Sequence, residues 1–224
     1  MGLGQGNGGA PPGFTGISTL MIRSYQKLGH GLEMQSAWSS MLFKLAAIIF
    51  VDDSELLHRA LSQSTTVEDF MHIVQRAIND WGGIGHAIGG TLKPSKCHGQ
   101  VVAFKFKRGK AEYKKVKELP STSLTIPKPD GSCATIPLKE VDEAVETLGV
   151  FTCPSGDFSA QLKKIKGKGL DWAENLRSNY LAPTDAWLGF KAQLYPSMKY
   201  GIGTISVKPK LMEVTYQKVY YRLL

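Results

Sequence analysis

Two adjacent aspartates, Asp52 and Asp53, follow an apolar run at residues 41–51 that is long enough for a strand. At a separation of about 4 Å and an effective dielectric of about 20, two carboxylates repel each other by roughly 4 kcal/mol. The nearest Lys or Arg residues are Lys44 and Arg59, too far along the chain for an obvious local ion pair. Either the pair forms a hairpin turn whose charges are in water, or another positive charge offsets the repulsion.

Basic residues gather in two blocks of the chain. Residues 105–117 hold seven Lys or Arg against one Asp or Glu, and residues 151–224 hold eleven against five, whereas residues 1–104 are balanced at seven of each. Two basic blocks together with an acidic pair would suit a phosphate backbone that is brought to a metal site. A lysine-rich face that is only solvated is the alternative.

Length and composition exclude several classes of protein. The chain has 224 residues, enough for one or two domains with a core. No apolar run approaches the roughly 20 residues needed to cross a bilayer, and the first residues lack a secretory signal. Cys97, Cys133 and Cys153 have no paired spacing, so we expect buried thiols and no disulfide framework or zinc site. We therefore expect an intracellular protein, nuclear or cytoplasmic, without a membrane partner.

The glycine-rich opening of the chain contains a formal dinucleotide-binding pattern, G-x-G-x-x-G, at residues 4–9. That pattern requires a strand before it and a helix that opens at the last glycine. No strand precedes it here, and Pro11 and Pro12 follow. The prolines instead predict the first turn of a helix, so a glycine loop leads into an amphipathic helix over residues 14–28.

Strands and helices that must position these residues follow from the periodicity of apolar side chains. Strands and helices both occur before a boundary near residue 155. After this boundary the spacing of apolar residues is helical throughout. The expected strands cover residues 41–51, 54–57, 101–107 and 147–153, with a hairpin over 123–138 that turns at Asp130-Gly131. The expected helices cover residues 14–28, a helix that begins with a capping box of Thr65 and Glu68, and residues 139–147, 161–180, 184–194 and 210–224.

The order of the motifs resembles that of the reverse transcriptases, and is most similar to the polymerases of non-LTR-type retroelements. The chain reads GQGNG, then FVDD, then a capped helix, then GGTLKPSKC and then TLGV, before a basic helical tail. Each motif is weak by itself, but five in this order cover nearly the whole chain. The resemblance implies an RNA-directed DNA polymerase, a nucleotidyltransferase that uses an RNA template, a DNA primer and deoxynucleoside triphosphates.

The resemblance implies that Asp52 and Asp53 hold magnesium, or manganese in its place, which would supply the missing positive charge. Magnesium prefers oxygen ligands and keeps several waters, so a few carboxylates and the substrate phosphates suffice. Asp52 is then the principal ligand and Asp53 the secondary one. Two ions about 4 Å apart would activate the attacking 3′-hydroxyl and stabilise the leaving pyrophosphate.

Other residues take roles from the same resemblance. Gln5 and Gly6 match a loop that lies against the templating base and the incoming nucleotide, and Lys96 matches a lysine that acts on the departing pyrophosphate. Leu148, Gly149 and Val150 match a strand that contacts the primer. The basic helix matches a thumb that lies on the template-primer backbone, and its lysines are Lys163, Lys164, Lys166 and Lys168.

The expected fold class is therefore α+β: an incomplete polymerase palm at residues 1–155, an antiparallel sheet with packed helices, followed by a small all-helical thumb at 156–224. The family has a third metal-binding aspartate and fingers upstream of the Gly-Gln-Gly loop, and we expect this chain to lack them as a truncated segment. Little polymerase activity is therefore expected from the chain alone. A non-catalytic, nucleic-acid-binding relic of such an enzyme stays open as an alternative. An unrelated metal-dependent phosphotransferase is a third hypothesis, without a convincing further acidic cluster.

Overall fold

The protein has an α+β fold with small antiparallel sheets and five α-helices in the part described by the computed structural model. The described residues are 10–50, 53–60, 62, 64–128, 130–178, 182–206, 208–210, 212–214 and 216–217. The chain forms two compact units, which meet between Lys139 and Glu140. We call them unit 1, up to Lys139, and unit 2, from Glu140.

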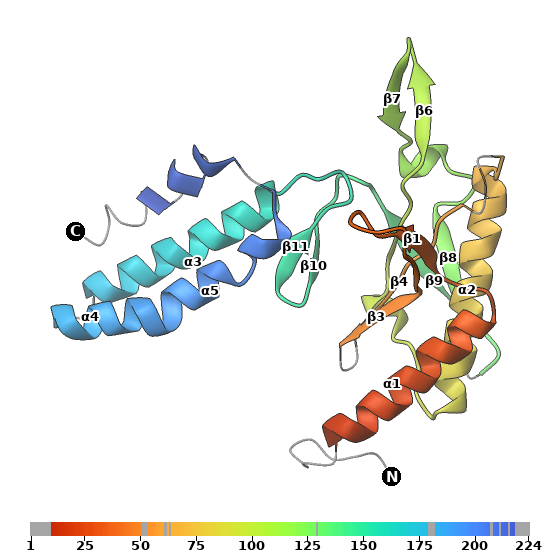
Figure 1. Cartoon of the computed structure of the whole chain (residues 1–224), viewed down its shortest axis with the longest axis horizontal. Helices are drawn as coiled ribbons and strands as arrows, with labels where there is room; N and C mark the ends of the chain where they lie inside the picture. The colour runs from red at the N-terminus through yellow and green to blue at the C-terminus, as the bar shows by residue number, and fades with distance from the viewer. Residues whose placement is uncertain are drawn as a thin grey trace. The chain divides into compact units, whose positions relative to one another are not determined.

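Unit 1 contains two long helices and a set of short strands (Figure 1). Helix α1 spans Ala10–Lys27 and helix α2 spans Val67–Ala87. Strands β1 (Leu32–Gln35) and β2 (Leu42–Leu45) form one hairpin, β3 (Ala47–Phe50) and β4 (Asp53–Leu56) a second, and β6 (Phe104–Lys107) and β7 (Lys110–Tyr113) a third. The remaining elements are β5 (Gly99–Gln100), β8 (Ser123–Pro127), β9 (Cys133–Lys139) and the 3₁₀ helices η1 (Pro94–Lys96) and η2 (Val116–Glu118).

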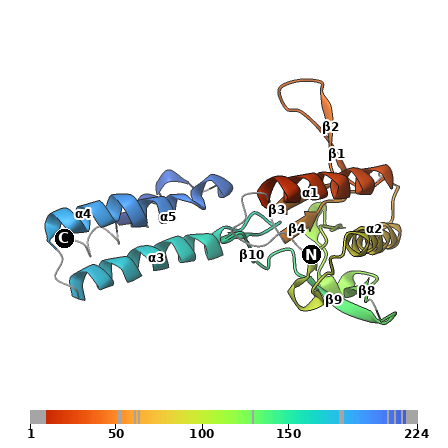
Figure 2. The ribbon, with the colours of Figure 1, turned by 90° about the horizontal axis from the view of Figure 1, so that it is seen from below.

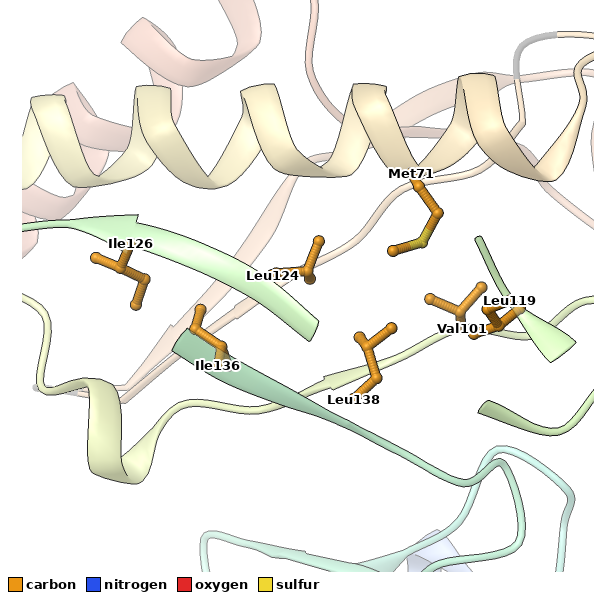
Figure 3. Packing of buried hydrophobic residues seen from close by; sticks show 7 residues of the cluster. All are labelled: Met71, Val101, Leu119, Leu124, Ile126, Ile136 and Leu138. Atoms are coloured by element: carbon orange, nitrogen blue, oxygen red, sulfur yellow. The ribbon is translucent and has the colours of Figure 1, made fainter. Parts of the chain in front are cut away.

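The main core of unit 1 lies between helix α2 and the sheet of order β5-β9-β8 (Figure 3). Strand β9 alternates exposed and buried side chains, as expected for a strand with one face in water. Gln75 of α2 ties the helix to the sheet, since its amide donates to the carbonyl of Thr125 and accepts from the Thr125 N–H. The buried side chains of this core are Met71, Val101, Leu119, Leu124, Ile126, Ile136 and Leu138.

Helix α2 confirms the helix that was expected to begin with a capping box, and it corrects the residues of that cap. Thr66 caps the helix, and its reciprocal partner is Asp69, one residue later than the expected pair of Thr65 and Glu68. Both registers place a threonine three residues before an acidic side chain, so the sequence pattern could not separate them. The helix continues through Gly82, Gly83 and Gly85 to Ala87.

The apolar run at residues 41–51 was expected to form one strand, and this is wrong. It divides at Ala46 between β2, which pairs with β1, and β3, which pairs with β4. Several of its large side chains are exposed, including Leu42, Ile48 and Phe50. Each half belongs to a two-stranded ribbon, which leaves part of its apolar surface uncovered.

Unit 2 consists of a hairpin and a helical hairpin (Figure 2). Helix α4 and helix α5 run alongside α3, and the buried side chains of Ile165, Leu194 and Met198 form their common core. A π-helical turn joins α4 to α5. The elements are β10 (Val145–Thr147), β11 (Val150–Thr152), α3 (Ser159–Ser178), α4 (Pro183–Gly189), η3 (Phe190–Leu194), α5 (Tyr195–Lys199) and η4 (Ile202–Thr204).

Three expectations for this region differ from the structure. Residues 147–153 were expected to form one strand, but a turn at Leu148 and Gly149 separates Thr147 of β10 from β11. Residues 139–147 were expected to form a short helix, but Val145 to Thr147 pair with β11 as a strand. The unit boundary also precedes this hairpin, whereas the change of periodicity predicted it near residue 155, because the hairpin packs against α3 of its own unit. The helix expected at residues 210–224 lies mostly outside the described residues.

Candidate functional site

The β3–β4 hairpin places Asp53 at the end where the two strands are joined. Phe50 pairs with Asp53, so two residues, Val51 and Asp52, connect the strands. Asp52 lies outside the described residues. The Asp53 side chain is exposed, and Glu55 is exposed further along the same strand. A carboxylate in this position is open to a ligand from solvent.

Apolar packing fixes the other end of this hairpin on helices α1 and α2. Ala47 is buried, and Ile49 and Leu56 pack against a cluster that includes Tyr25 of α1 and Trp81 of α2. The carbonyl of Ala46 also accepts a hydrogen bond from the Leu57 N–H. The hairpin is therefore held at its base, where the helices meet, while its joined end remains exposed.

A buried polar cluster lies at the base of the β3–β4 hairpin, beside the apolar cluster. The Tyr25 hydroxyl and Nε2 of His58 are 2.7 Å apart, and Nε2 of His30 lies 2.7 Å from Oδ2 of Asp80. The Tyr25 ring contacts His30 at a centroid distance of 4.5 Å and Trp81 at 5.2 Å. Tyr25 is fully buried and His30 almost so. These contacts tie α1, the turn after it, α2 and the segment after β4 together.

Burial sets the protonation of this cluster. It raises the pKa of Tyr25 well above its usual range, and the charge of Asp80 acts in the same direction. Burial first, and then the neighbouring His30, lower the pKa of His58 from 6.5 to about 4. At neutral pH Tyr25 is thus a phenol and His58 a neutral imidazole, and the tautomer of His58 decides which atom donates in the hydrogen bond between the hydroxyl and Nε2.

The neutral state of His58 predicts a loss of stability in acid. In the unfolded chain His58 takes up its proton near pH 6.5, but in the folded chain only near pH 4, so stability is complete above pH 6.5 and falls between these two values. Because His58 is only partly buried, we expect a loss of about 1–2 kcal/mol after solvent screening. Urea unfolding at pH 7 and pH 4 should show a smaller loss for His58→Gln than for the wild type. Equal losses would contradict this assignment.

Other expected site residues of unit 1 are placed separately. Gln5 and Gly6 lie outside the described residues. Lys96 ends the 3₁₀ helix η1 with an exposed side chain, and no hydrogen bond or ion pair in the described part of the chain joins it to Asp53. No group of three or more His, Cys, Asp or Glu that could hold a metal ion occurs among the described residues, which exclude Asp52.

In unit 2 the expected primer-contacting residues form the tight turn between β10 and β11. Leu148 and Gly149 both have positive φ, 51° and 78°, as in a type I′ turn of a two-residue hairpin. The carbonyl of Leu148 accepts a hydrogen bond from the Tyr200 hydroxyl at 2.9 Å, and that of Gly149 accepts from Nζ of Lys164 at 2.6 Å. Val150 is buried beneath the turn.

The four lysines of α3 do not share one face of the helix. Successive residues are about 100° apart on a helix, so Lys163 and Lys166 lie on one side and Lys164 and Lys168 on the other. Lys164 pairs with Glu146 and lies 5.3 Å from the centre of the Phe151 ring, and so fastens α3 to the hairpin. Lys163 and Lys168 are exposed, and Lys168 borders an open pocket between α3 and η3.

The polar cluster was missed from the sequence. The spacing of residues gave His30 no functional role, and the partners in the two hydrogen bonds are 33 and 50 residues apart in the chain. No local spacing signals such pairs. Tyr200 was likewise missed, since it contacts the β10–β11 turn from 52 residues away.

Comparison with known proteins leaves the class of this protein open. The chain matches no protein-family model, and neither the curated proteins nor the solved structures contain a match to it. No helix among the described residues is long and apolar enough to cross a membrane.

Proposed function

We propose that this chain is part of an RNA-directed DNA polymerase that extends a DNA primer by two-metal nucleotidyl transfer. The observation that carries the proposal is the β3–β4 hairpin. It places Asp53, the second residue of the tandem aspartate, at the exposed, joined end of two short strands, while its base is fixed on two helices. The order of motifs in the sequence supports the same function.

Asp52 and Asp53 are the residues that would hold the metal ions. The donor set fits magnesium, because carboxylate oxygens are its preferred protein ligands and it completes its shell with water and phosphate. The exposed carboxylate of Asp53 takes part in no ion pair within the described part of the chain. When bound, the ions would lower the pKa of the attacking hydroxyl and stabilise the leaving pyrophosphate.

The remaining residues would bind the substrates. Gln5 and Gly6 would contact the templating base and the nucleotide, and Lys96 would neutralise the pyrophosphate. The β10–β11 turn would present the backbone of Leu148–Gly149–Val150 to the primer. Lys163, Lys166 and Lys168 would contact phosphates of the duplex, whereas Lys164 supports that turn through Gly149.

A magnesium titration followed by thermal unfolding tests the metal site. A ligand at ten times its Kd stabilises the folded state by about 1.4 kcal/mol, which should raise the Tm by roughly 3–5 °C for a chain of this size. We expect the Asp52→Asn and Asp53→Asn variants to lose this shift. Glu55→Gln removes the same charge from the same strand and should retain it. A shift in all four proteins, or in none, would contradict the proposed site.

Primer extension tests the reaction itself. Any incorporation should depend on magnesium and on Asp52. Robust incorporation that persists in Asp52→Asn would show that the aspartates are not the metal ligands.

A non-catalytic nucleic-acid-binding protein is the second candidate, and the exposed lysines of α3 favour it independently of the aspartates. Such a protein would bind RNA in a salt-sensitive manner, since the release of counterions drives phosphate binding. RNA affinity that falls with salt, without a magnesium-dependent Tm shift, would support this candidate over the polymerase.

A further inference from the structure

The β6–β7 hairpin is a two-stranded ribbon that extends away from helix α2 and its sheet (Figure 1). Its turn residues Arg108 and Gly109 have positive φ, 50° and 76°, as in a type I′ turn. At its base the Lys114 N–H donates to the carbonyl of Ala103 at 2.8 Å. The ribbon is thus closed at both ends, while most of its side chains remain exposed.

One face of this ribbon is aromatic and faces solvent. The register pairs Phe104 with Tyr113 and Phe106 with Ala111, and alternation along each strand places these four side chains on the same face. The rings of Phe104 and Tyr113 are 5.1 Å apart. Phe106 is 80% exposed. Large exposed aromatic groups in a contiguous patch mark an interaction surface.

Cations lie at the free end of the ribbon, where Lys107 and Lys110 project from the face opposite the aromatic side chains. Lys107 and Lys110 form the last pair of the ribbon, and Arg108 is in the turn between them. No ion pair within the described part of the chain involves these three residues. Lys105, by contrast, pairs with Glu118 at 2.6 Å and so fixes the base of the ribbon. The free end of the ribbon is therefore both aromatic and positively charged.

We propose that the β6–β7 hairpin is a binding arm for single-stranded nucleic acid. Unpaired bases stack on the face of Phe104, Phe106 and Tyr113, and Lys107, Arg108 and Lys110 contact the phosphates. Aromatic platforms beside cations are how proteins bind single strands without sequence preference, because every base has a π-face. A second copy of this chain is a poor occupant, since residues 105–117 carry a net charge of +6 that would face its like.

This site goes beyond the proposed polymerase function, because it involves neither the aspartates nor α3. A duplex is a poorer occupant than a single strand, since its bases are already stacked on one another. We therefore expect the β6–β7 hairpin to bind single strands in preference to duplexes, and to do so without a metal ion.

The test uses the full chain and a fluorescein-labelled oligouridine of 20 nucleotides in EDTA, with affinity measured by fluorescence anisotropy. We expect Phe106→Ala to weaken binding by about 5- to 100-fold, the range that one base–aromatic stack accounts for. Phe106→Trp should restore it, whereas Phe106→Leu should not. Trp38→Ala is the matched control, because Trp38 is an exposed aromatic residue in the connection of the β1–β2 hairpin.

The cationic part of the arm is tested through salt dependence. Each phosphate contact on a single strand contributes about 0.7 to the slope of log affinity against log salt, so the triple variant of Lys107, Arg108 and Lys110 to Gln should reduce that slope by about 2. Lys163→Gln and Lys168→Gln should leave the effect of Phe106→Ala intact. The proposed binding arm would be contradicted if Phe106→Ala bound the oligouridine as tightly as the wild type does. It would also be contradicted if the variant lost as much affinity for a blunt duplex as for the single strand. Neither result would bear on the magnesium titration.

Discussion

Replacement of Trp81 by alanine is expected to lower the free energy of unfolding of unit 1 by about 3–5 kcal/mol. Trp81 is buried against Tyr25, Ala47 and Ala77, at the point where α1, α2 and the β3–β4 hairpin meet. Removal of a buried indole loses its transfer free energy and leaves a cavity that the surrounding helices can only partly fill. Urea unfolding followed by amide hydrogen exchange of the full chain measures the effect.

The exchange pattern makes this prediction specific. Protection should fall in α1, in α2 and in the β3–β4 hairpin, and the exchange of α3 should not change. Trp38→Ala removes an indole that is 98% exposed and should alter the free energy of unfolding by no more than about 0.5 kcal/mol. If the two variants were equally stable, Trp81 would not be the anchor of the hairpin.

The Ile165→Ala variant is expected to have the second large effect, a loss of about 2–5 kcal/mol in unit 2. Ile165 of α3 is 2% exposed and packs against the segment that contains Leu194 and Met198. The deletion removes three buried carbon atoms at the only cluster of fully buried apolar side chains that the structure describes in the helices of this unit. The same unfolding and exchange measurements apply.

Unit 2 offers its own matched control. Leu188 is an exposed leucine of α4, so Leu188→Ala should leave stability nearly unchanged. The exchange of α3 and α5 should rise in Ile165→Ala, while α2 keeps its protection. A loss of protection spread evenly over both units would show that they do not unfold as separate cooperative parts.

The stability of these two cores bears on the proposed sites. The metal-binding proposal needs a hairpin held on α1 and α2, which Trp81 and the Tyr25–His58 hydrogen bond provide. The β10–β11 turn, which is proposed to contact the primer, needs Lys164 and Tyr200, which α3 and the segment after α5 bring to it. The two destabilising variants therefore also identify which core each site depends on.

Local sequence determined the elements that depend on near neighbours. The proline-started helix α1, the capped helix α2, the β3–β4 return, the Asp130-Gly131 hairpin and helix α3 were all predicted from spacing, caps and turn residues. These signals operate within a few residues, where a side chain and the backbone group it satisfies are close in the chain. The tandem aspartate and the two basic blocks could be recognised in the same way.

Only the tertiary structure decided how these elements share their surfaces. Residues 145–147 became a strand because β11 pairs with them, and residues 41–51 divided between two hairpins because each half found a different partner. Lys164 became a support for the turn instead of a free cation, and Tyr25, His30, His58 and Asp80 converged from three distant segments. Burial and long-range pairing depend on which segments meet, and no spacing along the chain encodes that meeting.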